Sequence, residues 1–271
     1  MGHYRAGLRP KSVITSAARD LAVWQFAEKA RSLAALVMTF PATRHSIIRS
    51  LASDNATTKQ RAFETLASAY WKPVFNYIRL RWNANEQDAE DWTQEFFASA
   101  FEREFLASYD ASKARFRTFL RVCVDRMVMN SLKALSRQKR GGGSTEVSID
   151  DATVVIDSTN AELEELFRQE WIRSLFERAV DQLRAECEAS GKAVYFAVFE
   201  AYDIVGPSQR TTPSYAELAA KHGVPETQIT NYLAFARRRL RHHVLETLAT
   251  LTATDDEFAA EAREILGVEI P

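Results

Sequence analysis

The sequence predicts an all-α protein with two helical domains joined by a flexible linker, and three observations support this fold class. The 271 residues include only nine glycines and seven prolines. Apolar residues recur at the spacing of helices over long segments, whereas alternating runs typical of strands are few. Residues 141–160 are dominated by Gly, Ser, Thr and Asp, as expected of a linker. We therefore divide the chain into an N-terminal extension at 1–37, a first domain at 38–140, the linker at 141–160, a second domain at 161–249 and an acidic tail at 250–271.

Composition is that of a soluble globular protein, because the chain is 46% hydrophobic and 26% charged. Cys123 and Cys187 are far apart and form no C-x-x-C motif, which favours a reducing compartment, the cytoplasm, and argues against a metal site. The apolar run at 33–38 is too short for a membrane span and has no signal-peptide cleavage context, so no membrane insertion is expected. Residues 1–37 are interpreted either as a regulatory arm or as sequence upstream of a true start at Met38.

The distribution of charge is more informative than the net charge of −1. Residues 113–143 contain nine Lys/Arg and one acidic residue, whereas residues 144–190 contain four Arg and twelve Asp/Glu. Four of the five residues at 237–241 are arginines. Two basic segments separated by an acidic one predict a chain that contacts a polyanion twice.

An acidic and aromatic helix is predicted at 85–103. Asn85 is a good N-cap, and Asp88 lies at the position that answers it in a capping box. At 100° per residue one face carries Ala89, Trp92, Phe96, Phe97 and Ala100. Asp88, Asp91 and Glu95 line up on another face. Such a helix either packs with one face and offers the other to a partner, or is a core helix with a solvated acidic side.

A basic and aromatic helix is predicted at 115–139. Its cationic face carries Arg115, Arg126, Lys133 and Arg137, with Asn130 beside them and Phe119, Val122 and Met129 interleaved. Basic side chains neutralise phosphates, and exposed apolar groups stack on unpaired bases. The pattern indicates a nucleic-acid surface, with a solvated basic face as the alternative.

Residues 214–244 have the pattern of a helix-turn-helix. Ser214 and Glu217 predict a capping box, and Gly223 has the conformational freedom that a tight turn needs. A second helix follows from Val224, with Ile229 directed inward. Its polar face carries Thr227, Thr230 and Asn231, followed by Arg237, Arg238, Arg239 and Arg241. Early residues of such a helix can meet base edges and later arginines can bind phosphate, while the alternative is an ordinary helical hairpin.

These segments occur in a characteristic order: DAEDWTQEFF, then FRTFLRVCVDRMVMNSLKALSRQKRGGG, the linker, and SYAELAAKHGV. The arrangement resembles a bacterial RNA polymerase sigma factor of the extracytoplasmic-function type, over about residues 40–248. The resemblance implies an N-terminal region 2-like helical bundle and a C-terminal region 4-like helix-turn-helix domain. It also implies a protein that is not an enzyme and needs no cofactor and no metal.

The resemblance assigns site residues and partners. The residues that it assigns to binding core RNA polymerase are Asp88, Asp91, Gln94, Glu95 and Phe96. Those that it assigns to the −10 promoter element are Arg115, Arg117, Arg121, Arg126, Asn130 and Lys133. Those assigned to the −35 element are Thr227, Thr230, Asn231, Arg237 and Arg238. The implied partners are promoter DNA, the clamp helices of the largest polymerase subunit and the flap of the second, with an anti-sigma factor as a further candidate.

The sequence departs from the family pattern at Arg126 and near the start of the recognition helix, and the tail lies outside the pattern. Arg126 stands where family members commonly have Asn or another polar residue. Thr230 and Asn231 stand near the start of the recognition helix, where basic residues are often found. In the tail, Phe258, Ala262, Ile265 and Leu266 predict a short amphipathic helix. We expect this helix to fold back on the helix-turn-helix domain and to tune its activity.

Three rival functions are of other classes. A helix-turn-helix repressor or activator would bind duplex DNA without polymerase, which leaves the acidic helix and the basic helix unexplained. A metal-dependent nuclease or phosphohydrolase would use Asp88, Asp91 and Glu95 as Mg²⁺ ligands, but no second helix supplies matching acids or histidines. A scaffold that uses only the acidic face would leave both basic segments without a role.

Overall fold

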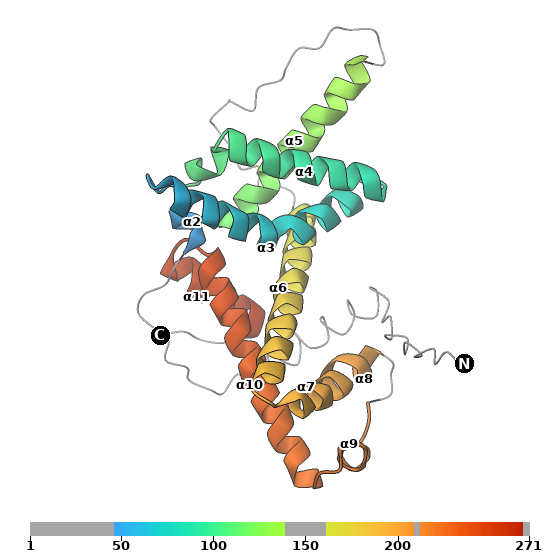
Figure 1. Cartoon of the computed structure of the whole chain (residues 1–271). Helices are drawn as coiled ribbons and strands as arrows, with labels where there is room; N and C mark the ends of the chain where they lie inside the picture. Colours follow the sequence, from blue (N-terminus) through green and yellow to red (C-terminus); the bar gives the residue numbers. More distant parts are fainter. Residues whose placement is uncertain (1–45, 139–160, 209–211, 268–271) are drawn as a thin grey trace, which may run out of the picture. The chain divides into compact units, whose positions relative to one another are not determined.

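The computed structural model describes residues 46–138, 161–208 and 212–267, and every regular element in these ranges is a helix (Figure 1). This confirms the all-α class for the part of the chain that is described. The predicted N-terminal extension at 1–37 and the predicted linker at 141–160 lie outside the described residues. Within the described ranges, no helix is both long enough and apolar enough to cross a membrane.

The chain divides into two compact units. Among the described residues, the smaller unit contains 183–239, and the larger unit contains those up to 182 and from 240 onward. This division differs from the predicted boundary, because residues 161–182 and the predicted tail group with the first domain. The aromatic contact between Tyr77 and Phe167, with ring centroids 5.2 Å apart, illustrates the packing that joins residues 161–182 to that domain.

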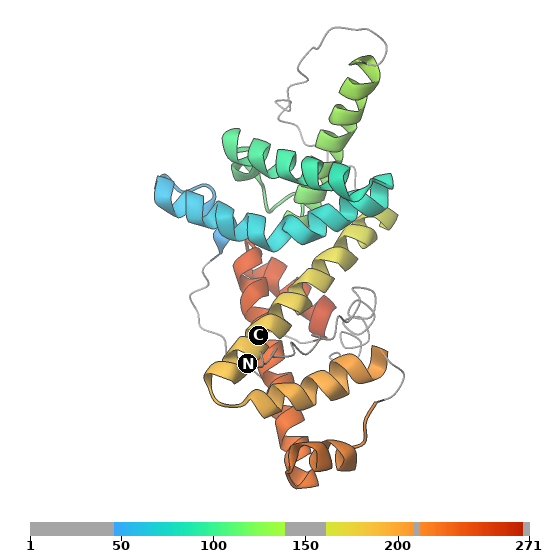
Figure 2. The ribbon, with the colours of Figure 1, turned by 45° about the vertical axis from the view of Figure 1, so that its right-hand side comes forward.

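The larger unit begins with α2 (Ile47–Ser50), α3 (Ala56–Trp82) and α4 (Glu86–Glu102). Asn83 adopts the left-handed conformation that ends α3, and Asn85 caps α4, so the two long helices are joined by a short turn. They lie side by side in both views of the ribbon (Figures 1 and 2). The ring of Phe97 stacks on Trp71 with centroids 5.7 Å apart, which orients the apolar face of α4 toward α3.

A 3-10 turn, η1 (Phe105–Ser108), leads to α5 (Phe116–Gln138). The apolar side of α5 is fully buried at Phe116, Leu120, Val124 and Val128. The ring of Tyr109 lies 5.1 Å from that of Phe116, and the Tyr109 hydroxyl donates a 2.8 Å hydrogen bond to the Ala114 carbonyl. The connector before α5 is therefore held against the start of that helix.

Two further segments complete the larger unit: the first part of α6 (Ala161–Ala189), and the end of α10 (Glu226–Leu251) with α11 (Asp255–Leu266). Thr254 caps α11 and Gly267 ends it with φ of 65°. The apolar face of α11 is buried at Phe258, Ala262, Ile265 and Leu266, which confirms the amphipathic helix predicted for the tail. The Ser46 hydroxyl donates a 2.7 Å hydrogen bond to the Thr252 carbonyl, so α2 is tied to the segment just before α11.

The smaller unit contains the helix-turn-helix. It comprises the end of α6, α7 (Ala193–Phe199), a π-helical segment η2 (Glu200–Val205), α8 (Gly206–Ser208), α9 (Tyr215–His222) and the start of α10. The predicted capping box is present, since Ser214 and Glu217 bond each other reciprocally. Gly223 adopts φ of 65° and donates its N–H to the Ala219 carbonyl, so the predicted turn is confirmed.

Candidate nucleic-acid and protein interfaces

The acidic helix α4 has two distinct faces. Asp88, Asp91, Gln94 and Glu95 are exposed, whereas Ala89, Thr93, Phe97 and Ala100 are buried. The side-chain oxygen of Asn85 accepts the Asp88 backbone N–H at 2.8 Å, and its amide donates to the Asp88 carboxylate at 2.8 Å. The exposed face therefore begins at a well-anchored helix end and presents three carboxylates and one amide to solvent.

Phe96 is not part of that exposed face. Its side chain is 1% exposed, and its ring lies 5.2 Å from Phe97 and 5.9 Å from Phe105. In this structure the Phe96 side chain is therefore not accessible to a partner, although the family resemblance assigns it to partner contact. Its helical position places it among the core aromatics, where it orients α4 and supports the acidic face from behind.

The acidic residues of α4 do not assemble a metal site with other side chains. Over 46–138, 161–208 and 212–267, no group of three or more His, Cys, Asp or Glu side chains is placed so as to hold a metal ion. Asp88, Asp91 and Glu95 lie along the exposed side of one helix and are not part of such a group. The alternative of Mg²⁺ bound by these three acids has no supporting geometry.

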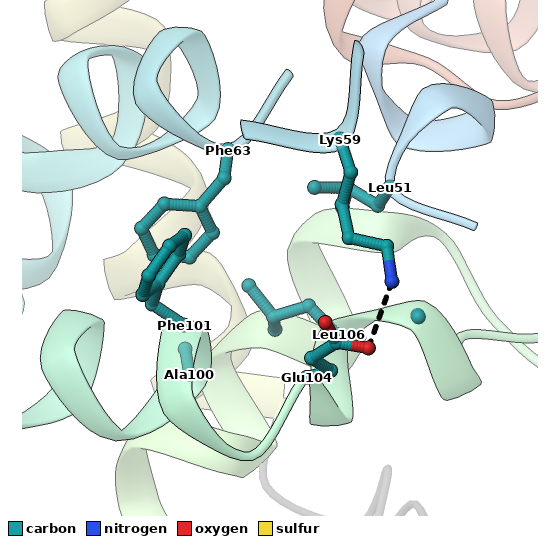
Figure 3. A pocket seen from close by; sticks show the side chains of 8 residues that line it. Leu51, Lys59, Phe63, Ala100, Phe101, Glu104 and Leu106 are labelled. Carbon is teal, nitrogen blue, oxygen red and sulfur yellow. Dashed lines mark hydrogen bonds and ion pairs between the residues drawn. The ribbon is translucent and has the colours of Figure 1, made fainter. Parts of the chain in front are cut away.

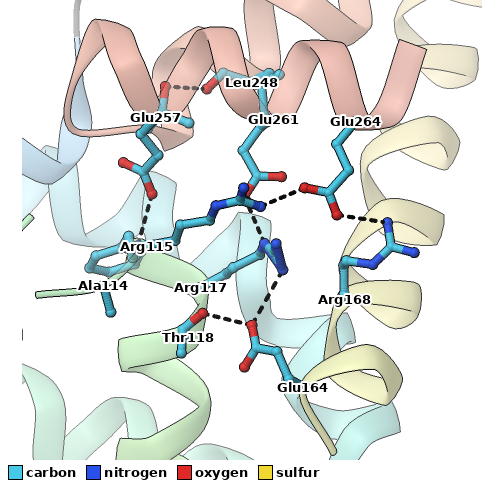
Figure 4. Close-up of polar contacts among 12 residues, drawn as sticks. Ala114, Arg115, Arg117, Thr118, Glu164, Arg168, Leu248, Glu257, Glu261 and Glu264 are labelled. Carbon is cyan, nitrogen blue, oxygen red and sulfur yellow. Dashed lines mark hydrogen bonds and ion pairs between the residues drawn. The ribbon is translucent and has the colours of Figure 1, made fainter. Parts of the chain in front are cut away.

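The basic face of α5 divides into two parts, and the first is engaged by carboxylates (Figure 4). Arg115 Nη1 lies 3.1 Å from Glu261 and 2.6 Å from Glu264 of α11. Arg117 Nε lies 2.8 Å from the same Glu261, and its Nη1 lies 3.4 Å from Glu164 of α6. The start of α5 is thus bound to two helices that come from distant parts of the sequence.

Arg121 is held in the same way. Its Nε lies 2.9 Å from Glu164, and its Nη1 lies 2.7 Å from Asp125 on the next turn of α5. Arg117 is 5% exposed and Arg121 is 2% exposed. A buried guanidinium must be paired, and these pairs satisfy that need within the protein. In this structure, carboxylates of the protein itself therefore hold Arg117 and Arg121, the two buried arginines that the family resemblance assigns to the −10 element.

Glu257 of α11 completes the cluster. One of its carboxylate oxygens accepts the Phe116 backbone N–H at 2.8 Å, and the other accepts the Ala253 backbone N–H at 2.7 Å. Burial raises the pKa of Glu261, although the charges of Arg117 and Arg115 oppose the shift. The tail helix therefore packs on the start of α5 and, through Glu264 and Arg168 at 3.5 Å, on the part of α6 that belongs to the larger unit. Its expected effect on the helix-turn-helix stays a prediction.

The second part of the α5 basic face has the mixed character that single-stranded nucleic acid favours. Arg126 and Asn130 are half-buried, and Lys133 is exposed. Between them Met129 is 44% exposed and Leu132 is 37% exposed. Cationic and apolar groups therefore share one accessible surface, as phosphate contact combined with base stacking requires.

The recognition helix of the helix-turn-helix presents most, though not all, of the predicted residues. Thr227, Thr230, Asn231 and Arg238 are exposed at the start of α10. Arg237 instead forms a bidentate pair with Asp203 of η2, with Nε and Nη2 each 2.8 Å from a carboxylate oxygen. Asp203 is 2% exposed, so Arg237 neutralises a buried carboxylate. Arg237 is therefore a structural residue in this unit, and Arg238 beside it is the accessible cation.

Sequence reasoning missed four acids that pair with the arginines: Glu164, Asp203, Glu261 and Glu264. Glu261 lies 144 positions from Arg117, and Asp203 lies 34 positions from Arg237. Neither separation corresponds to a helical repeat. The only signal in the sequence was indirect, since a cationic residue on a largely apolar helix side needs an acid from elsewhere.

A small pocket lies between α3, the end of α4 and η1 (Figure 3). It is lined mainly by apolar side chains, among them Phe63, Phe101 and Leu106. Its charged side chains, Lys59 and Glu104, pair with each other at 2.8 Å. The pocket therefore offers a ligand mainly apolar contact, without the convergent polar groups that small-molecule sites use for orientation.

Comparison with known proteins adds no relative: no family model, no curated protein and no solved structure matches this chain.

Proposed function

We propose that this protein is an RNA polymerase sigma factor of the extracytoplasmic-function type, which directs core polymerase to specific promoters and helps to melt the −10 region. The observation that carries the proposal is the presence of three surfaces in one chain, in the order typical of that family. They are the exposed acidic face of α4, the mixed cationic and apolar end of α5, and the polar start of α10. Each surface has a chemistry suited to a different partner.

In the proposed complex, the acidic face of α4 binds the clamp helices of the largest polymerase subunit. Asp88, Asp91 and Glu95 supply charge to a basic coiled coil, and Gln94 supplies a neutral hydrogen-bonding group. Complementary charge steers association and selects the partner. Phe96 contributes by holding the helix in place, since its own ring is buried.

The end of α5 holds the melted −10 element in this proposal. Unpairing and flipping a base costs a few kcal/mol, which contacts to the extruded strand must offset. Arg126 and Lys133 are suited to phosphate contact, Asn130 to a base edge, and Met129 and Leu132 to the face of an unpaired base. These residues are the half-buried and exposed members of the proposed −10 surface, whereas Arg117 and Arg121 are buried when α11 is docked.

The start of α10 reads the −35 element as duplex. A recognition helix places its N-terminal residues against base edges in the major groove. Thr227, Thr230 and Asn231 can exchange hydrogen bonds with those edges, and Arg238 can contact phosphate. Since these early positions are uncharged, affinity for this element depends on a few hydrogen bonds more than on cationic contact.

The acidic face of α4 also separates this proposal from its nearest rival. A helix-turn-helix repressor or activator needs the α10 surface alone and has no use for an exposed acidic face. A carboxylate row repels DNA, so its retention on the surface is best explained by a protein partner of opposite charge. The proposal therefore assigns α4 to a protein and α10 to DNA.

Run-off transcription tests the proposal. Purified core polymerase from the source bacterium would transcribe a genomic promoter library with and without the protein. We expect promoter-specific transcripts that depend on the protein and disappear with Asp91→Ala. Glu90→Ala is the matched control, because Glu90 is an exposed acid of α4 at the opposite edge of the solvent-facing side, and it should leave transcription intact. Absence of specific transcripts, together with binding to duplex DNA without polymerase, would replace the proposal by a plain DNA-binding regulator.

A further inference from the structure

We propose that α11 is a built-in competitor for DNA, whose carboxylates occupy Arg115 and Arg117 and must leave before these arginines can contact phosphate. This inference rests on the proposed function and names a regulation of its −10 surface. The tail then acts as an autoinhibitory element at the start of α5, upstream on the same helix from Arg126, Asn130 and Lys133.

The chemistry of the contact is the first support. Glu257, Glu261 and Glu264 are spaced at four and three residues, so they lie on one face of α11 and point toward α5 (Figure 4). Carboxylates and phosphates are the anions to which guanidinium groups bind in the same charge-assisted geometry. A row of acids directed at arginines therefore fills the positions that a nucleic-acid backbone would take.

Two features reduce the net stabilisation of docked α11. Glu261 is 1% exposed, and one of its carboxylate oxygens has no hydrogen-bond partner among the described residues. Burying a carboxylate in this way offsets much of the attraction that its ion pairs supply. In addition, α11 has 12 residues, which is too short for a stable isolated helix, so its docking must also overcome the entropy of ordering. Burial of Phe258, Ile265 and Leu266 opposes these costs and holds the helix in place.

Accessibility suggests where DNA would first make contact. The Arg115 side chain is 35% exposed, and its partner Glu264 is 37% exposed, so phosphate can approach this pair from solvent. Arg117 lies deeper and would follow once Glu261 moves. Arg121 is paired with Glu164 and Asp125, so the departure of α11 leaves its contacts unchanged.

A direct test uses the full chain and a labelled single-stranded oligonucleotide of mixed sequence at low ionic strength, without polymerase. Glu261→Gln/Glu264→Gln removes the α11 carboxylates that pair with Arg115 and Arg117, and leaves Arg117 its 3.4 Å contact with Glu164. Each phosphate that an arginine newly neutralises on a single strand steepens the slope of log K against log[salt] by about 0.7. If both arginines are released, we expect tighter binding and a slope steeper by about 1.4, so the gain over wild type grows roughly sevenfold when the salt concentration falls fourfold. Arg115→Ala in the double variant should reduce that slope by about 0.7.

A matched control separates the local effect from the loss of negative charge. Glu264→Gln and Asp256→Asn each remove one charge from α11, but Asp256 is exposed in its first turn, away from the ion pairs with α5. We expect tighter binding with a salt slope steeper by about 0.7 for Glu264→Gln, and no more than a small general charge effect for Asp256→Asn. The inference would be overturned if wild type, Asp256→Asn and the double variant all bind the oligonucleotide and do so with equal affinity. That result would not contradict the proposed function.

Hydrogen exchange on the wild-type chain covers the case in which the double variant does not fold. Because coupling between two binding events is reciprocal, oligonucleotide binding must weaken α11 docking, and amides at 258–266 should then exchange faster. Unchanged or slower exchange with the oligonucleotide bound would overturn the inference. If no form of the chain binds the oligonucleotide, the inference fails, and promoter-specific transcription with core polymerase then decides the proposed function independently.

Discussion

The pairing of Arg237 with Asp203 leads to a prediction that separates a structural arginine from a DNA-binding one. In Arg237→Ala the Asp203 carboxylate, which is 2% exposed, loses both of its 2.8 Å hydrogen bonds. Removing one partner of a fully buried pair costs about 3–5 kcal/mol. Since the Arg237 side chain is 25% exposed, water can replace part of the loss, and we expect about 2–3 kcal/mol.

Hydrogen exchange of the smaller unit is the appropriate assay, because residues 183–239 contain no tryptophan to report on its unfolding. A loss of about 2–3 kcal/mol makes amides that exchange through unfolding of this unit exchange roughly 30- to 150-fold faster. Peptides from α9 and from the start of α10 should therefore lose protection in Arg237→Ala.

Arg238→Ala is the matched control, since Arg238 is the adjacent residue, carries the same charge and is exposed. Its stability should change by no more than about 0.5 kcal/mol. If the α10 surface contacts phosphate, Arg238→Ala should bind duplex DNA more weakly than wild type. The slope of log K against log[salt] should then be smaller in magnitude by about 0.9. In Asp203→Asn/Arg237→Ala the unpaired charge is gone, so this double variant should be more stable than Arg237→Ala. Wild-type exchange in Arg237→Ala, or a double variant no more stable than Arg237→Ala, would refute the reasoning.

Three other predictions concern the core, the capping box and a half-buried thiol. Phe96→Ala should destabilise the larger unit by about 3–5 kcal/mol, seen by tryptophan fluorescence in denaturant; a change below about 1 kcal/mol would contradict its placement in the core. Hydrogen bonds from the backbone and hydroxyl of Ser214 lower the pKa of Glu217 in the folded protein. The capping box therefore stabilises α9 at pH values above the pKa of Glu217 in the unfolded chain. This stabilisation is lost as the pH falls through the lower pKa of the folded protein. An NMR titration should find the Glu217 midpoint below its ordinary value, and Ser214→Ala should raise it. Burial raises the pKa of the Cys123 thiol to about 12, although the charge of Arg126 opposes the shift. Because the thiolate is the reactive form, alkylation of Cys123 at neutral pH should be on the order of 10³-fold slower in the folded protein than in the unfolded chain. Comparable alkylation rates in the two states would refute this prediction.

Local features of the fold were predictable because a few neighbouring residues determine them. Asn85 caps α4, Ser214 and Glu217 form a capping box, and Gly223 takes a left-handed turn, as their identities and spacing predicted. These structures need only hydrogen bonds within one helical turn or the absence of a side chain. The apolar face of α4 was equally predictable, since periodicity alone places Phe96 and Phe97 on one side.

The assignment of Phe96 to partner contact had a different origin. Helical spacing put this residue on the apolar face of α4, and the structure agrees. The family resemblance, in contrast, put it among the partner contacts, because a sequence motif does not separate the residues that touch a partner from those that support them. Physical pattern was the better guide at this position.

Residue types and spacing by themselves determined that the chain is helical, where its main helices begin, and which face of each is apolar. Tertiary structure alone decided which arginines remain on the surface. Arg117 meets Glu261 across 144 positions, and Arg237 meets Asp203 across 34. The physical reason is that helical periodicity predicts that an apolar face will be covered, without naming the segment that covers it. Charge pairing depends on distance in space, so a basic face read along the sequence cannot distinguish an arginine that awaits phosphate from one that a distant carboxylate already holds.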